Sequence, residues 1–392
     1  MAQRHLDPTD HGAPEVTGDA LAAYLRAQAT EFLRALRLHR ETGGSAAGGG
    51  QETVDAARAL RRSARRISGS LHTFRPLLDA DWSEEIRPEL AWLSGTLGLE
   101  HAYAARLERL LLALHRLSGA AVFPEQSVVV TRAAAQQGGS VAALAGGARA
   151  AGAAGARTPG RARAGLAEAA QDTAGPARPA PAPDRGNLTV GAAKAGALLE
   201  RQLTLARTRA HSTALQALGS SRFHAVADKV ALLASEVPLT PAAPTTGLRP
   251  LAAAAEERLT DAVAALPLLT AGHPYNAEAL VHGLSPDPAP HPQDTPWHQV
   301  RLLLRLHRYA REVLSGGGAP ADAGLPAAGL ALNRHRDASE AASAAAQAAR
   351  TPRITPATAY ALGVLHADQR HEVEAARFAF QQAWQKQAVG AS

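Results

Sequence analysis

The hydrophobic positions of this chain are filled mainly by alanine and leucine, which restricts the folds that it can adopt. Hydrophobic residues make up 46% of the sequence, but aromatic residues make up only 4%. Alanine and leucine favour helices, whereas strands are enriched in β-branched and aromatic residues. The short stretch SVVVT (127–131) is isolated, and no sustained alternation of β-branched residues follows it. We therefore expect an all-α protein, and 392 residues suffice for one large or two small domains.

The charge is basic and is carried almost entirely by arginine. The formal net charge is +6 and the pI is about 10.1, and lysine occurs only at positions 194, 229 and 386. A GC-rich genome accounts for this bias, and so does phosphate binding, because guanidinium groups bind phosphate bidentately. The absence of cysteine excludes disulfides, thiolate catalysis and cysteine metal sites.

No targeting or membrane segment is expected. The N-terminal stretch MAQRHLDPTDHGAPEV lacks the apolar core of a signal peptide. No run of eighteen apolar residues is present, so we expect no membrane span and no membrane partner. A cytoplasmic protein is the resulting prediction.

A compositional change divides the chain into two helical halves. Residues 132–186 consist mostly of Ala, Gly, Pro, Arg and Gln, and they lack the apolar side chains that would offset the entropy of ordering them. We predict a disordered tail at 1–16, helical halves at 17–131 and 187–388, and a flexible insert at 132–186. The predicted helices are at 17–41, 53–77, 88–97, 99–118, 191–218, 220–235, 250–266, 296–314, 337–350 and 355–387.

Two of these helices carry the same ladder of cations. HQVRLLLRLHR places His298, Arg301, Arg305 and Arg308 at spacings of three, four and three, and RALRRSARRIS repeats the first three positions with arginines 58, 61 and 65. At about 100° per residue, such positions share roughly one quarter of the helix circumference. Each ladder therefore forms a basic stripe.

The stripes have a structural and a functional interpretation. In the first helix, Leu60, Ile67, Leu71 and Phe74 lie opposite the cations, as expected for a solvated basic face above a core. Like charges at these spacings destabilise a helix by about 0.2–0.5 kcal/mol per pair, and no Glu is interleaved. Two such helices side by side would line a groove suited to an extended polyanion.

The ladders and their flanking motifs resemble the CHAD family, the conserved-histidine α-helical domain. The family pattern H-x-x-R-x-x-x-[RK]-R-x-R matches the second ladder closely. In the first ladder, Arg58 replaces the histidine and Ser68 replaces the last arginine. TFRPLLD (73–79), ELAWLSGTLG (89–98) and LGSSRFHAVADKVALL (218–233) are also typical. The resemblance implies two antiparallel four-helix bundles, related by a pseudo-repeat and forming one domain with a central basic groove.

The resemblance also implies a ligand, inorganic polyphosphate, and a set of residues that bind it. The implied polyphosphate-binding residues are Arg58, Arg61, Arg65, Arg66, His298, Arg301, Arg305, Arg308 and Tyr309. One departure lies downstream of the first ladder, where His101, Ala102 and Ala104 replace an Arg-Asp pair and a further Asp. No E-x-E-x-K signature of the triphosphate-tunnel domain is present, so we expect a stand-alone module, in which association with polyphosphate granules, chain-length sensing and regulation of a partner remain open.

Other functions find less support. Nucleophile elbows, phosphate loops and paired catalytic carboxylates are absent, so we expect no enzyme and no cofactor. HEVE (371–374) and HPYNAEALVH (273–282) lack metal-ligand spacing. His298 has a structural alternative, packing at the helix start on Trp297. Sequence-specific and single-stranded nucleic-acid binding are disfavoured because only Tyr309 and Trp297 are available for stacking, whereas non-specific binding to nucleic-acid phosphates stays an alternative.

A helical scaffold that binds an unidentified protein remains the main alternative, because the first ladder is divergent. An alternating rim of arginines and acids would favour the scaffold, whereas a continuous cationic groove would favour a polyanion.

Overall fold

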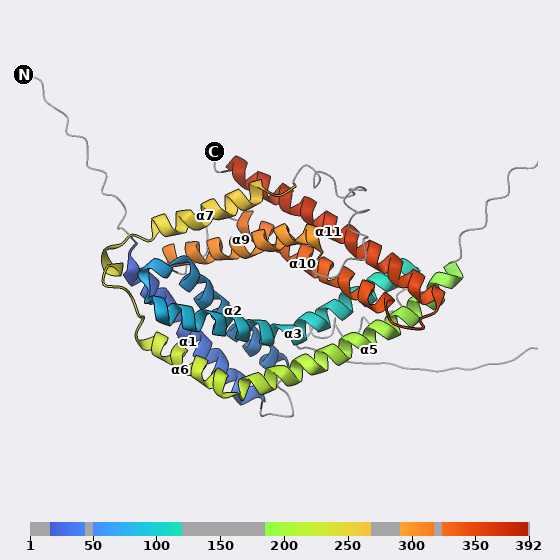
Figure 1. Cartoon of the computed structure of the whole chain (residues 1–392), viewed down its shortest axis with the longest axis horizontal. Coiled ribbons are helices and arrows are strands. Elements are labelled where there is room, and N and C mark those ends of the chain that lie inside the picture. The colour runs from blue at the N-terminus through green and yellow to red at the C-terminus, as the bar shows by residue number, and fades with distance from the viewer. Residues whose placement is uncertain (1–15, 44–49, 120–184, 268–290, 317–323, 391–392) are drawn as a thin grey trace, which may run out of the picture. The chain divides into compact units, whose positions relative to one another are not determined.

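The computed structural model describes residues 16–43, 50–119, 185–267, 291–316 and 324–390. These residues belong to one compact unit that draws on the chain before and after positions 120–185. Its helices are α1 (Gly18–Gly43), α2 (Gly50–Thr73), α3 (Ala80–Ser118), α5 (Arg185–Leu218), α6 (Ser221–Ser235), α7 (Arg249–Ala264), α9 (Thr295–Leu314), α10 (Gly324–Ala349) and α11 (Pro356–Gly390) (Figure 1). Within the described ranges no strand forms, and the all-α prediction is confirmed. The predicted tail (1–16), apart from residue 16, and the predicted insert (132–186), apart from residues 185 and 186, lie outside the described residues and stay predictions.

The helices bury their apolar faces in three hydrophobic clusters. The first joins α1, α2 and α6 to the N-terminal part of α3 and the C-terminal part of α9, around Phe32, Phe74 and Phe223. The second joins α5 to parts of α3, α10 and α11. The third surrounds Trp297 and Phe380 and joins α7 to α9, α10 and α11. Because α3, α7, α9, α10 and α11 each contribute to two clusters, the assignment of helices to two four-helix bundles stays a prediction.

Helix α3 corrects one sequence prediction. We expected Pro88 to begin a helix, but it lies inside a single helix of 39 residues that Asp79 caps through the Trp82 N–H at 2.8 Å. A proline inside a helix removes one hydrogen bond and costs about 3 kcal/mol. The flanking Ile86 and Leu90 are fully buried in the first cluster, and this packing explains why the helix continues.

Helix α10 corrects another. The prediction began this helix at Asp337, but it begins at Gly324 and lies antiparallel to α11 (Figure 1). Its N-terminal part is apolar, with Leu325, Ala328 and Leu332 almost completely buried. The additional turns bring residues 324–336 into the unit, including Asn333, His335 and Arg336, which are described with the site below.

Candidate functional site

The two ladder helices lie against each other. α2 and α9 are in contact, and they lie close together at Gly69, where an added Cβ atom would stand 2.5 Å from Cδ2 of Tyr309. Only a glycine permits the Tyr309 ring to lie this close to the α2 backbone. The sequence prediction that the ladders share one site therefore has a geometric basis.

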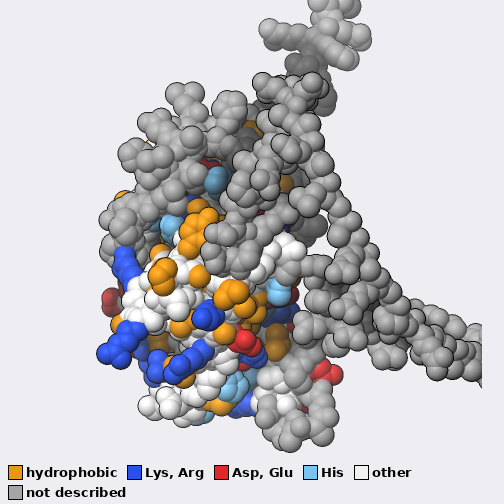
Figure 2. Space-filling model, turned by 90° about the vertical axis from the view of Figure 1, so that its right-hand side faces the viewer, with side chains coloured by type: hydrophobic (Ala, Val, Ile, Leu, Met, Phe, Trp, Pro, Cys, Tyr) orange, Lys and Arg blue, Asp and Glu red, His pale blue; other side chains and the backbone are white. Residues whose placement is uncertain are grey.

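A pocket of about 610 Å³ opens between α2, α3, α9 and α10, and we call it the basic pocket. Five arginines contribute to its lining: Arg65, Arg87, Arg301, Arg305 and Arg336. On the face in Figure 2, where described residues are visible, Lys and Arg side chains lie among hydrophobic and neutral ones.

Three ladder arginines in the basic pocket lack acidic partners. Within the described part of the chain, no carboxylate forms an ion pair with Arg65, Arg301 or Arg305. Arg301 instead donates from Nε to Oδ1 of Asn333 at 2.8 Å. Cations that are largely withdrawn from water are normally paired, so this arrangement favours an anion from outside the protein as a partner.

The pKa values of these three arginines are lowered, as expected for cations that lack acidic partners. Burial, followed by repulsion from neighbouring guanidinium groups, lowers the pKa of Arg65 to about 10 and that of Arg301 to about 9. Burial and Arg336 also lower the pKa of Arg305. Arginine stays protonated in proteins, so these three guanidinium groups remain charged and repel one another in the folded state.

The other arginines predicted in the first ladder have partners within the protein, a carboxylate for Arg58 and Arg66 but only a backbone carbonyl for Arg61. Arg58 pairs with Asp55 at 3.1 Å on the surface. Arg61 donates to the Ser94 carbonyl oxygen at 3.1 Å, which anchors α2 to α3. Arg66 is neutralised by Glu312 of α9, whose Oε2 lies 2.8 Å from its Nε.

Glu312 also accepts a hydrogen bond from the Tyr24 hydroxyl at 3.0 Å. Burial and this carboxylate raise the pKa of Tyr24 strongly. The ion pair between Arg66 and Glu312 thus joins α1, α2 and α9, away from the lining of the basic pocket.

Two predicted residues of the second ladder also lie outside the basic pocket. His298 packs edge-to-face on His335, with 5.6 Å between ring centroids, rather than on the adjacent Trp297. Burial lowers the pKa of His298, so its ring is neutral near pH 7. Arg308 extends toward Gly329 of α10, where an added Cβ would lie 3.7 Å from its Nη1. Of the nine predicted residues, the basic pocket therefore gathers Arg65, Arg301, Arg305 and Tyr309.

Two arginines of the basic pocket were missed by the sequence analysis. One helix start was predicted at Asp337, directly after Arg336, and another at Pro88, directly after Arg87. Both arginines were therefore left outside the predicted helices. Each has an internal partner: Arg87 pairs with Glu84 at 3.3 Å, and Arg336 pairs closely with Asp337. The stretch NRHRD (333–337) was a usable signal, because its basic residues are adjacent to the alanine-rich sequence that was predicted to be helical.

A second basic surface, on α3, alternates cations with acids. Arg109 pairs with Glu372 at 3.5 Å and Arg116 with Asp368 at 2.7 Å, and Arg106 pairs closely with Glu340. We call this surface the alternating rim. It has the pattern expected of a protein-binding scaffold, and the basic pocket has the pattern expected of a polyanion site.

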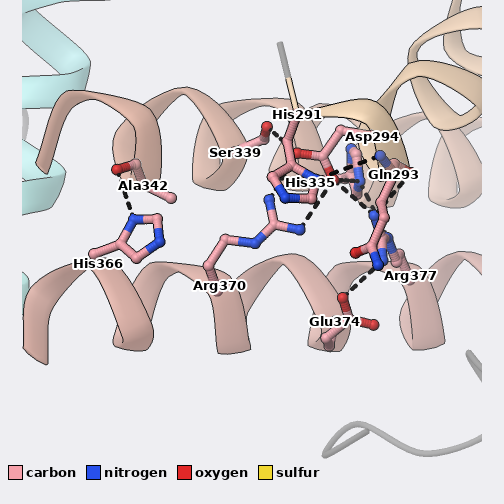
Figure 3. A network of polar contacts seen from close by, with 10 residues as sticks. All are labelled: His291, Gln293, Asp294, His335, Ser339, Ala342, His366, Arg370, Glu374 and Arg377. Atoms are coloured by element: carbon pink, nitrogen blue, oxygen red, sulfur yellow. Dashed lines mark hydrogen bonds and ion pairs between the residues drawn. The ribbon is translucent and has the colours of Figure 1, made fainter. Parts of the chain in front are cut away.

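A buried network fixes the N-terminal end of α9 against α10 and α11 (Figure 3). Asp294, which is fully buried, accepts hydrogen bonds from Arg370 and Arg377 at 2.7 Å each and from the Ser339 hydroxyl. Burial alone would raise the pKa of Asp294, but hydrogen bonds from His335 and Arg370 and the charge of Arg370 hold it well below its usual range. The network holds together the helices that carry Arg301, Arg305 and Arg336.

Neither a metal site nor a membrane span emerges. Among the residues that the structure describes, no group of three or more metal-ligating side chains converges, and HEVE (371–374) is included in that statement. HPYNAEALVH (273–282) lies outside the described residues. No helix in the described part of the chain is both long and apolar enough to cross a bilayer.

The comparisons with known proteins agree with this geometry. The sequence model of the CHAD domain matches residues 27–346, which is more than half of the chain. The chain therefore belongs to the CHAD domain family, and this membership associates it with polyphosphate. Among solved structures, PptA from Streptomyces chartreusis is 64% identical, with a TM-score of 0.68, over 94% of this chain and 99% of that one. A search of curated proteins gives no match.

Proposed function

We propose that the chain binds inorganic polyphosphate in the basic pocket and catalyses no reaction on it. The observation that carries the proposal is the convergence of Arg65, Arg301 and Arg305 without acidic partners. Phosphate oxygens accept charge-assisted hydrogen bonds from guanidinium groups, often two at a time. A bound polyanion would relieve the repulsion among these arginines.

The remaining basic side chains extend the site. Arg336 and Arg87 exchange a carboxylate partner for a phosphate group when the ligand enters. Arg58, Arg66, His298 and Arg308 contribute long-range charge or structure rather than direct contacts. Duplex nucleic acid fits poorly, because its phosphates follow a broad curved surface, whereas the unpaired arginines line a pocket.

A protein-binding scaffold is the second candidate, and the alternating rim favours it. Paired charges such as those of Arg109 and Arg116 suit a protein surface that carries both signs. The two candidate functions are compatible, because the alternating rim and the basic pocket use different arginines. The two surfaces are linked through Glu340, which pairs both with Arg106 of the rim and with Arg336 of the pocket.

The test is a titration of the full chain with polyphosphate across a salt series. Arg305→Gln is expected to weaken binding at least tenfold, because a charge-assisted hydrogen bond contributes about 1.5–3 kcal/mol. Arg58→Gln is the matched control, since it removes the same charge from an exposed ladder position and is expected to change affinity less than threefold. Equal losses in both variants would contradict a localised site, and release of phosphate during incubation would contradict the absence of catalysis.

A further inference from the structure

A smaller pocket opens beside the basic pocket, and we call it the side pocket. It has a volume of about 200 Å³ and lies between α2, α3 and α10. Four arginines and two carboxylates contribute to its lining: Arg61, Arg106, Arg109, Arg336, Asp337 and Glu340. Cations therefore outnumber acids around the side pocket, and the charge of its lining favours an anion.

The side pocket is joined to the basic pocket through shared side chains. Arg336 contributes to the lining of both pockets. Arg61 lines the side pocket and donates from Nε to the carbonyl oxygen of Ser94, a residue of the basic pocket, at 3.1 Å. Along α2, Arg61 lies one helical turn, about 6 Å, from Arg65. A linear polyanion in the basic pocket therefore has a second cationic cavity next to it.

Arg61 lacks a counter-charge within the described part of the protein. No carboxylate of the described residues forms an ion pair with it. Its guanidinium group lies directly against the α3 backbone at Gly98, where an added Cβ atom would collide with Cζ of Arg61. Burial, followed by repulsion from Arg336 and Arg305, lowers the pKa of Arg61. A phosphate group in the side pocket would supply the charge that Arg61 lacks, because hydrogen bonds between guanidinium and phosphate are charge-assisted.

The two carboxylates of the side pocket are free to exchange partners. Asp337 and Glu340 both pair with Arg336, and Glu340 also pairs with Arg106. Their side chains are 48% and 38% exposed, so water solvates them when they turn away from the arginines. Ion pairs as exposed as these contribute little to stability. A phosphate group therefore displaces the carboxylates at a low energetic cost.

We propose that the side pocket is a second phosphate subsite, which makes the protein selective for long polyphosphate chains. The proposal rests on the proposed function, because the chain is held first in the basic pocket. Short chains contact the unpaired arginines of the basic pocket. A longer chain continues past Arg336 and also contacts Arg61. The additional charge-assisted hydrogen bonds tighten the binding of the long chain alone.

The experiment compares tripolyphosphate with a long-chain polyphosphate in calorimetric titrations of the full chain across a salt series. The affinity for the long chain is expected to fall more steeply with salt, because more of its phosphates contact the protein. Ala102 lines the side pocket and offers the test variant. Ala102→Asp places a carboxylate there and is expected to weaken long-chain binding roughly fivefold or more, while tripolyphosphate binding changes less than about twofold.

Ala102→Asn is the matched control for this variant. Asparagine has nearly the size and helix propensity of aspartate but carries no charge. The difference in long-chain affinity between the two variants therefore reports the effect of a negative charge in the side pocket, separated from the effects of side-chain size and helix stability.

Three results would overturn this inference and leave the proposed function intact. They are the same salt dependence for both ligands in the wild-type chain, equal long-chain affinity of Ala102→Asp and Ala102→Asn, and weakening of both ligands by the same factor in Ala102→Asp. The wild-type comparison needs no variant, so misfolding of a variant does not spoil the test. Failure of both ligands to bind the wild-type chain would refute the proposed function, and this inference with it.

Discussion

Replacing Arg65 with methionine should stabilise the ligand-free protein and weaken its binding of polyphosphate. Arg65 is half-buried among cations without an acidic partner, and burial and its neighbours lower its pKa from 12.5 to about 10. At about 1.36 kcal/mol per unit, the protonated guanidinium carries roughly 3 kcal/mol of unfavourable energy as an upper bound. Relaxation of the pocket reduces this figure, so we expect a gain of about 1–2 kcal/mol from a methionine of similar length.

The assay is thermal unfolding of the full chain at low salt, with and without polyphosphate. For a domain of this size, the gain corresponds to a rise in Tm of roughly 1–4 °C without ligand. Polyphosphate is expected to raise the Tm of the wild-type chain more than that of the variant, because ligand binding to the folded state adds stability. Arg58→Met is the control: its partner Asp55 and its position are exposed, so its effect is expected to stay within about 0.5 kcal/mol. A lower Tm for Arg65→Met without ligand would refute the reasoning that Arg65 is held in the fold at an energetic cost.

Three further predictions concern the structure around the basic pocket. Asp294→Asn removes the carboxylate that pairs with buried Arg370 and leaves buried Arg377 with Glu374 alone, and it is expected to cost about 3–5 kcal/mol in urea unfolding; a loss below 1 kcal/mol would contradict the role of the network. Burial lowers the pKa of His335 from 6.5 to about 4, so on acidification the unfolded chain binds a proton at this residue before the folded chain does. The stability that neutral His335 contributes is therefore complete above pH 6.5 and declines as the pH falls toward 4. The free energy of unfolding is therefore expected to fall by about 2 kcal/mol between pH 6.5 and pH 5, and His335→Gln is expected to flatten this dependence. Gly69→Ala forces the Tyr309 ring away from α2 and is expected to cost about 1–3 kcal/mol, with no loss expected if the close approach is wrong.

The sequence predicted helices well where an apolar period and a cap coincided. At the starts of the predicted helices 220–235 and 355–387, Ser220 caps α6 through the Phe223 N–H at 3.2 Å, and Thr355 caps α11 through the Thr358 N–H at 3.3 Å. Pro88 misled the prediction because local propensity predicts a helix start there, whereas tertiary packing of its neighbours continues the helix.

The site was predictable only in part, because helical spacing identifies a basic stripe but not the partners of its members. Arg65 and Arg66 are adjacent in sequence, yet one lies unpaired in the basic pocket and the other against Glu312, 246 residues away. His298 satisfies the family pattern, but its ring packs on His335 from a helix segment that was not predicted. Such contacts depend on how α2, α9 and α10 pack, which no local pattern encodes.

The most direct test of the account is the structure of the full chain bound to a short polyphosphate. The account predicts phosphate oxygens about 2.7–2.9 Å from the guanidinium nitrogens of Arg65, Arg301 and Arg305. Phosphates bound along the alternating rim, with the basic pocket vacant and these three arginines uncontacted, would contradict its central claim.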